Sequence, residues 1–440
     1  CYNLLNHSMI EELIFPAGCR LFQRWQEGDT QASNRLKEIF DKTIDGEYDE
    51  IFALKTSPSS VQASASINLF VLAVLTRLYG LNSAEAYKGD AKRYVRVSLM
   101  IRKLLGLPKL YLEWPVYAFT AEALGAVMMY PVGAPPGTDP GIPLINKDNW
   151  QDLKAPEMDS EIPRLFDEML EFYQDLTGLE PVLHLTAPYS LAADIYGQSE
   201  LATALNDEPD HVNELLDHLV DNVLMPWADY FFEKFPNGWL ELSDASGSPF
   251  FIGPENCKNT AIRSILRLKN ENSWGSRVYD ANYRGDYVTQ AKKTSRSSRR
   301  RVTTQKGPSK ELSFSELFAV KQDVCTDYVM RLHDDRMPLK LYQEQAIKRN
   351  VPIFIGIGAS QIDCNSIADI SAAKEEIKQL SLEYVESIKK VAQVIKKNGY
   401  KLRKPPWPGT VYFEDVSANS SMEIIEIIVS TVLNKGSLKG

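Results

Sequence analysis

The stretch LHLTAPYSLAADIYGQSELATALNDEPDHVNELLDHLVDNVL, residues 183–224, contains the structural unit that repeats along this chain. It starts inside a short β-prone run, PVLHLT at 181–186, and polar residues stand where that run ends. Asp207-Glu208-Pro209 is then a helix start signal, with proline near the first turn. Apolar side chains follow at helical spacing, at Val212, Leu215, Leu216, Leu219, Val220, Val223 and Leu224. The pattern predicts a strand followed by a helix with one apolar face.

The same unit returns from about residue 105 to the carboxyl terminus. Further β-prone runs are KLYLEW (109–114), GWLELSD (238–244), SRVYDAN (276–282), DYVMRLHDD (327–335), VPIFIGIG (351–358) and TVYFED (410–415). A periodic segment at 370–395 predicts a helix that ends at Asn398-Gly399, and Ser420 and Glu423 have capping-box spacing. Strands that alternate with helices predict a parallel sheet, and seven or more units favour a (β/α)8 TIM barrel. An open doubly wound sheet is the alternative.

The first hundred residues differ from this pattern because they are mainly helical. We expect residues 1–100 to form an amino-terminal helical extension or cap, and residues 101–440 to form the barrel. A basic segment at 287–310 is expected to be a loop insertion in that barrel.

Composition and charge narrow the class of protein. Of the 440 residues, 44% are apolar and 24% charged, which is typical of a soluble globular protein. A net charge of -9 disfavours nucleic acid and anionic membranes as partners, and no apolar run is long enough to span a membrane. The five scattered cysteines favour a reducing compartment, so we expect a cytoplasmic protein. No signal-peptide pattern precedes the first helix, and a start at Cys1 suggests that natural sequence precedes it.

Two predicted strand ends carry the candidate catalytic residues. Asp280, Asn282 and Arg284 alternate, so they face the same way if the segment stays extended. In YVMRLHDDR, His333 shares a face with Asp335 and lies among carboxylates, as a general acid or a metal ligand would. The carboxyl ends of barrel strands meet at one face, which would bring these residues together. A turn or an ion-pair cluster is the structural alternative for each group.

Substrate-binding residues are predicted at neighbouring strand ends. Asp244 and Ser246 lie in SDASGSPFFIGPENC, a loop whose backbone amides could hold an anion, or which is only a tight turn. His184 ends another strand, with a satisfied core histidine as the alternative, and Arg331 is placed beside the site. Arg300 belongs to AKKTSRSSRRRVTTQKG, predicted as a lid that grips carboxylates or phosphates, or as a solvated loop.

The order of segments resembles the uroporphyrinogen decarboxylase superfamily, a barrel group that includes corrinoid-dependent methyltransferases. The resemblance spans roughly residues 100–435. It is carried by AEALGAVMMYPVG (121–133), by residues 183–224, by SDASGSPFFIGPE (243–255), and by NGYKL before a capped terminal helix.

The family motifs that this sequence lacks indicate which branch of the superfamily it resembles. The arginine-glycine-arginine and F-S-D-I motifs of true uroporphyrinogen decarboxylases are missing, and Glu113 stands out of register with the family aspartate. Asp280 and Asn282 occupy the places of the zinc-binding H-x-C pair in the family's thiol-activating methyltransferases. A zinc-thiolate site is therefore not supported, and the metal is left unknown. The corrinoid-binding motif D-x-H-x-x-G is also missing, so a corrinoid would come on a separate protein.

The resemblance implies a methyltransferase that moves a methyl group from a small methylated compound to a corrinoid carried by a partner protein. A decarboxylase of a polycarboxylate is the second hypothesis, and its carboxylates would account for the basic loop. A non-catalytic protein that binds a partner through this loop is the third. Expected partners are a small-molecule substrate and a corrinoid protein, with neither nucleic acid nor membrane, and a homodimer is left open.

Overall fold

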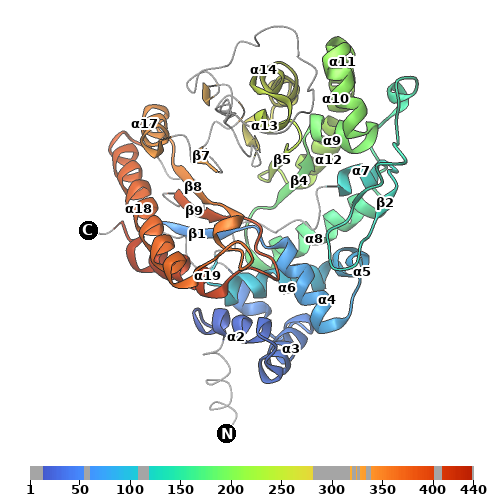
Figure 1. Cartoon of the computed structure of the whole chain (residues 1–440). Coiled ribbons are helices and arrows are strands. Elements are labelled where there is room, and N and C mark those ends of the chain that lie inside the picture. Colours follow the sequence, from blue (N-terminus) through green and yellow to red (C-terminus); the bar gives the residue numbers. More distant parts are fainter. Residues whose placement is uncertain are drawn as a thin grey trace, which may run out of the picture.

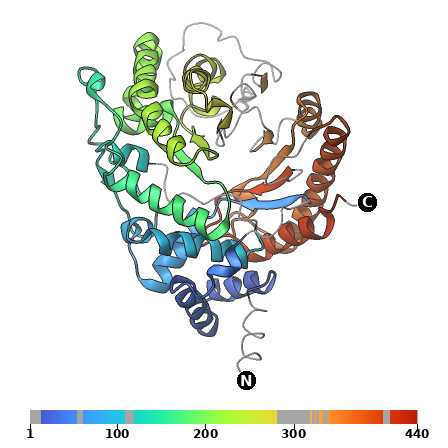
Figure 2. The same cartoon turned by 180° about the vertical axis from the view of Figure 1, so that it is seen from behind.

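The structure is a computed structural model that describes residues 13–53, 60–107, 118–280, 318–319, 324, 328–332, 338–400 and 409–438. Its described strands form two parallel sheets and one short antiparallel pair. The helices lie around the outside of the two parallel sheets (Figure 1, Figure 2). This arrangement is mixed α/β, as the alternating pattern predicts.

One sheet has four strands in the order β1-β9-β8-β7, all of them parallel. Its members are β1 (Gln62–Ala65), β7 (Val329–Arg331), β8 (Ile353–Ile357) and β9 (Gly409–Phe413). The other parallel sheet has the order β4-β5-β6 and consists of β4 (Val182–Thr186), β5 (Trp239–Ser243) and β6 (Val278–Asp280). β2 (Met128–Met129) and β3 (Gly137–Thr138) form the antiparallel pair. These bounds confirm the predicted strands at 181–186, 238–244, 351–358 and 410–415, whereas 109–114 lies outside the described residues.

The helices fall into three groups along the chain. The first comprises α2 (Ala17–Gln26), α3 (Thr30–Ile44), η1 (Asp49–Phe52), α4 (Asn68–Tyr79), α5 (Ser83–Lys88) and α6 (Ala91–Leu104). The second comprises α7 (Phe119–Ala123), η2 (Trp150–Asp152), α8 (Glu161–Thr177), α9 (Pro188–Tyr196), α10 (Gln198–Asp207), α11 (Pro209–Leu219), η3 (Val220–Leu224), α12 (Met225–Lys234), α13 (Pro249–Ile252), α14 (Pro254–Asn256), η4 (Cys257–Ile262), α15 (Arg263–Asn270) and η5 (Gly275–Arg277). The third comprises α17 (Leu339–Arg349), η6 (Ala359–Gln361), α18 (Ile370–Lys397) and α19 (Met422–Lys435).

Local sequence signals account for several helix ends. Pro209 occupies the first turn of α11, whose apolar face is buried as its spacing predicts. α18 starts at Asp369, whose side chain accepts hydrogen bonds from the amides of Ser371 and Ala372. The predicted cap of the terminal helix is wrong by one residue. Ser421 caps α19 by accepting from the amide of Ile424, and Ser420 instead accepts from the amide of Ser417.

The first and last described strands are neighbours in the four-stranded sheet. β1, from the first hundred residues, pairs with β9 from Gln62↔Thr410 to Ala65↔Phe413. A boundary at residue 100 therefore does not separate two sheets, and an independent amino-terminal cap stays a prediction. Within the described ranges, no strand pairing joins the two parallel sheets, so a closed TIM barrel is not shown.

Candidate functional site

Each parallel sheet has one apolar and one polar face. In the three-stranded sheet, Leu183, Leu185, Leu240, Leu242 and Val278 all belong to the main hydrophobic core. Side chains alternate across a strand, so the residues between them point to the opposite face. There His184 pairs in register with Glu241, and Thr186 pairs with Ser243. All four of these polar residues are buried, and this face is the candidate site.

His184 and Glu241 form the central pair of this polar face. The Nδ1 atom of His184 lies 3.3 Å from Oε1 of Glu241, and each residue is only 7% exposed. A carboxylate at one ring nitrogen orients an imidazole and determines which nitrogen carries the proton. Sequence reasoning identified His184 but missed Glu241. The signal was present, because both strands share a pattern in which one polar residue stands between two leucines.

Asp244 anchors the loop that follows β5. It is fully buried, and its Oδ1 accepts hydrogen bonds from the hydroxyl of Ser190 at 2.7 Å and the amide of Gly247 at 3.1 Å. The Ser190 hydroxyl also accepts from the amide of Ser246 at 3.0 Å. These two amides are thus used inside the protein, contrary to the predicted anion site. Burial, with the charge of Asp244, raises the pKa of neighbouring Tyr189 to about 12.

The four-stranded sheet repeats the division into two faces. Ala63, Ala65, Ile355, Ile357 and Val411 belong to the hydrophobic core. Ser64 and Thr410 lie at alternate positions, on the opposite face, and both are buried. Their hydroxyl oxygens have no hydrogen-bond partner among the residues that the structure describes. A buried hydroxyl without a protein partner is commonly satisfied by an ordered water.

Arg331 lies on the helix-covered face of its sheet. Its guanidinium donates to the hydroxyl of Tyr384 in α18 at 3.0 Å, and the side chain is buried. The contact explains how the sheet accommodates a buried arginine. It gives no support to the predicted role of Arg331 in substrate binding.

The other predicted residues fall mostly outside the described part of the chain. Asn282, Arg284, Arg300, His333 and Asp335 all lie there, as does the basic loop at 287–310. The backbone of Asp280 is described, and this residue ends β6 in register with Leu242 of β5. The strand therefore ends beside Asp244's strand, as predicted, and the chemical roles of these residues stay predictions.

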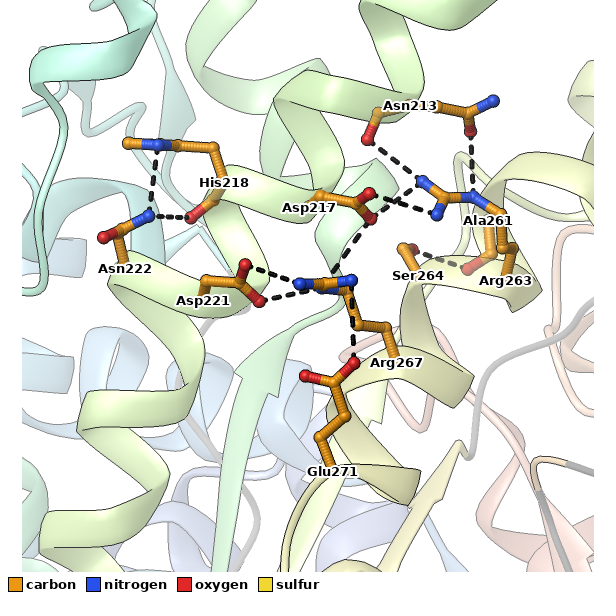
Figure 3. A network of polar contacts seen from close by, with 10 residues as sticks. All are labelled: Asn213, Asp217, His218, Asp221, Asn222, Ala261, Arg263, Ser264, Arg267 and Glu271. Carbon is orange, nitrogen blue, oxygen red and sulfur yellow. Dashed lines mark hydrogen bonds and ion pairs between the residues drawn. The ribbon is translucent and has the colours of Figure 1, made fainter.

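Two π-helical segments lie in the helices that surround the three-stranded sheet. η3 continues α11, and η4 precedes α15. An ion-pair network joins α15 to α11 and η3, in which Arg263 binds Asp217 and Arg267 binds Asp221 through two contacts of 2.8 Å (Figure 3). π-Helical turns are rare and occur frequently at functional sites. Here they accompany the helices next to the Asp244 loop.

Within the described ranges, no group of three or more histidine, cysteine, aspartate or glutamate side chains is arranged to hold a metal ion. His184 and Glu241 alone do not provide the three protein ligands of a catalytic zinc site. In the same part of the chain, no helix is both long and apolar enough to cross a membrane.

Comparison with known proteins identifies a fold. A methyltransferase from Methanosarcina mazei matches with a TM-score of 0.53, covering 89% of this chain and 96% of that one. The two sequences are 11% identical, so the likeness concerns the fold alone. No family model and no curated protein matches the chain. The chain thus has a fold that a methyltransferase also has.

Proposed function

We propose that this protein is a methyltransferase of the uroporphyrinogen decarboxylase superfamily, in its corrinoid-linked branch. It would move a methyl group from a small methylated compound to a corrinoid carried by a partner protein. The observation that carries the proposal is the likeness to a methyltransferase along nearly the whole of both chains. The pairing of β1 with β9 further supports a (β/α)8 barrel, because closure of a barrel makes the first and last strands neighbours.

The proposed reaction places one requirement on the leaving group. The bond between the methyl carbon and its heteroatom would break, the heteroatom would keep the electron pair, and the reduced corrinoid of the partner protein would supply the pair for the new bond to carbon. An oxygen or sulfur leaving group then needs a proton, whereas an ammonium nitrogen leaves as a neutral amine and needs none. In this proposal His184, which lies beside Glu241 on the polar face, would donate that proton or orient the heteroatom.

Within the described ranges no cluster fits a resident metal, and the proposal leaves the metal unknown. Asp280, Asn282, Arg284, His333 and Asp335 remain proposed to orient and protonate the substrate, with Arg300 on a lid. Asp244 and Ser246, which the sequence predicted to bind substrate, are in this proposal supports of the loop that follows β5.

Transfer of a radiolabelled methyl group to free, chemically reduced cobalamin tests the function. The full chain would be incubated with labelled methanol, a methoxybenzoate, dimethyl sulfide or a methylated amine, and the label in cobalamin counted. If His184 donates a proton, His184→Gln should slow transfer from oxygen donors about 100-fold, and transfer from ammonium donors much less. Asp175→Asn, an exposed carboxylate on α8, is the matched control.

Absence of labelled cobalamin with every donor, together with release of CO2 from a porphyrin polycarboxylate, would overturn the methyltransferase proposal in favour of decarboxylation. Equal rates for His184→Gln and the unaltered protein would remove His184 from the chemistry.

A further inference from the structure

Within the described ranges, β4 is the outer strand of its sheet, because the order is β4-β5-β6 and β4 pairs with β5. Successive amides of a strand point to its two opposite sides. The amide of Ala187, directly after β4, donates to the carbonyl of Ser243 in β5 at 2.9 Å. The amide of Thr186, one residue earlier, therefore points away from β5 and needs an acceptor from outside the pair of strands.

The hydroxyl of Thr120 in α7 provides that acceptor. The Thr186 amide donates to Oγ1 of Thr120 at 3.0 Å. Both residues are buried, with Thr120 1% and Thr186 2% exposed. A buried amide that loses its acceptor costs free energy, because water does not reach it. At this point of the sheet edge, a threonine side chain thus does what a neighbouring strand would do.

The helix that carries Thr120 is itself held in place. Phe119 is fully buried in the core. Oε1 of Glu122 lies 2.6 Å from Nζ of Lys88 in α5, and Oε2 accepts from the hydroxyl of Tyr130 at 2.7 Å. The short helix α7 therefore has an apolar anchor and a charged one, and it offers the Thr120 hydroxyl to β4 at a fixed position.

The bond to Thr120 lies two residues from His184. Residues two apart on a strand share a face, so Thr186 and His184 both belong to the polar face of the sheet. β5 holds one side of β4, and the Thr120 hydroxyl holds the other side at its last residue. Fixing both sides limits the movement of His184 relative to Glu241. Their contact of 3.3 Å is long for a hydrogen bond, so a small displacement would break it.

We propose that Thr120 is a positioning residue for the polar face. Its hydroxyl fixes the end of β4 and thereby holds the His184 imidazole against the Glu241 carboxylate. As a statement about catalysis, this inference rests on the proposed function, whereas the positioning is measured without any substrate. A carboxylate only accepts hydrogen bonds, so Nδ1 of His184 carries a proton when the pair is formed. The location of this proton reports whether the pair is intact.

Nitrogen NMR of the full chain, with isotope-labelled histidine, shows which ring nitrogens carry a proton. The chain has five histidines, and His184→Gln identifies the signals of His184. In the unaltered protein, Nδ1 of His184 should carry a proton. Thr120→Val keeps the shape of the side chain without its hydroxyl, and should shift His184 to a mixture of both tautomers. Thr120→Ser keeps the hydroxyl and should restore the signals of the unaltered protein.

Thr177→Val is the matched control. Thr177 is also 1% exposed, and its hydroxyl accepts from the amide of Leu179 at 3.1 Å. It ends α8, ahead of the amino end of β4, so the variant loses a similar bond on the other side of the strand. Thr177→Val should leave the signals of His184 unchanged. The same change in Thr177→Val, or unchanged His184 signals in Thr120→Val, would overturn the inference.

Circular dichroism and cooperative unfolding establish whether Thr120→Val is folded. Thr120→Ala, which removes the hydroxyl and adds no apolar group, is the second variant. If neither variant folds, the unaltered protein decides. A lone pair on Nδ1 of His184 would then overturn the inference, because Glu241 would not be accepting from it, and a proton on Nδ1 would support it.

Methyl transfer provides a second measurement. Thr120→Val should slow transfer from oxygen donors about tenfold and transfer from ammonium donors much less, as expected of His184→Gln. Thr177→Val should retain the unaltered rates. A tautomer shift in Thr120→Val, in a protein that transfers no methyl group to cobalamin, would support the positioning and contradict the function. Methyl transfer at an unaltered rate in Thr120→Val, with unchanged His184 signals, would support the function and remove Thr120 from the site.

Discussion

Asp194 on α9 and Asp221 in η3 are carboxylates of neighbouring helices with opposite surroundings. Asp221 receives two contacts of 2.8 Å from Arg267, within a network that also joins Arg263 to Asp217 (Figure 3). Asp194 has no partner within the described residues, and its hydration is reduced. The network satisfies its charges internally and holds two helices together, whereas Asp194 on α9 has no such pairing within the described residues.

The largest expected effect comes from Asp194→Asn. A folded-state pKa of about 7 against an ordinary value of 3.8 means that the folded protein binds the proton more tightly. Stability therefore falls as pH rises from about 4 to 7, by up to about 4 kcal/mol. The variant should gain this amount at pH 8 and nothing at pH 4, as measured by urea unfolding at both values. Equal stability at pH 8 would mean that Asp194 is well hydrated.

Asp244→Ala should have a smaller effect of opposite sign. It removes the acceptor of the Ser190 hydroxyl and the Gly247 amide, both buried, and should cost about 2–4 kcal/mol. Denaturant unfolding measures the loss, and Ser190→Ala should reproduce only part of it. An unchanged midpoint for Asp244→Ala would show that the loop does not depend on this carboxylate.

Asp221→Asn should have the smallest effect. The ion pair with Arg267 is half-exposed, so its loss should cost about 0.5–1 kcal/mol and should shrink in high salt. Thermal unfolding in 0.05 M and 1 M NaCl would measure the loss of stability and its dependence on salt. If Asp221→Asn lowered the free energy of unfolding by more than about 2 kcal/mol, the ion-pair network would stabilise the protein as much as the buried Asp244 loop does. The contrast between a half-exposed and a buried set of contacts would then be wrong.

Much of the fold could be read from the sequence because it depends on local patterns. The run PVLHLT and the apolar spacing after Pro209 predicted β4 and α11 correctly. The position of β1 could not be read in this way, because its partner β9 lies more than 300 residues away and the short run QASA contains no β-branched or aromatic residue. The candidate site was also predicted only in part, because local patterns do not show which residues from distant strands meet. Asp244 follows the end of β5 as predicted, whereas His184 lies in the middle of β4 and not at its end. Glu241 becomes part of the site only through its register with His184.

The sequence by itself determined most of the segments that become strands and helices, and that several parallel strands are followed by polar residues. Only the tertiary structure decided which of those residues meet and what charge each one feels. The Arg331 guanidinium donates to the Tyr384 hydroxyl, and the Asp244 carboxylate accepts from the Ser190 hydroxyl. Both residues belong to predicted strand runs, as His184 does, yet they have different partners. The physical reason is that alternation and helical spacing act over a few residues. Hydration and ion pairing, in contrast, depend on neighbours brought from distant parts of the chain.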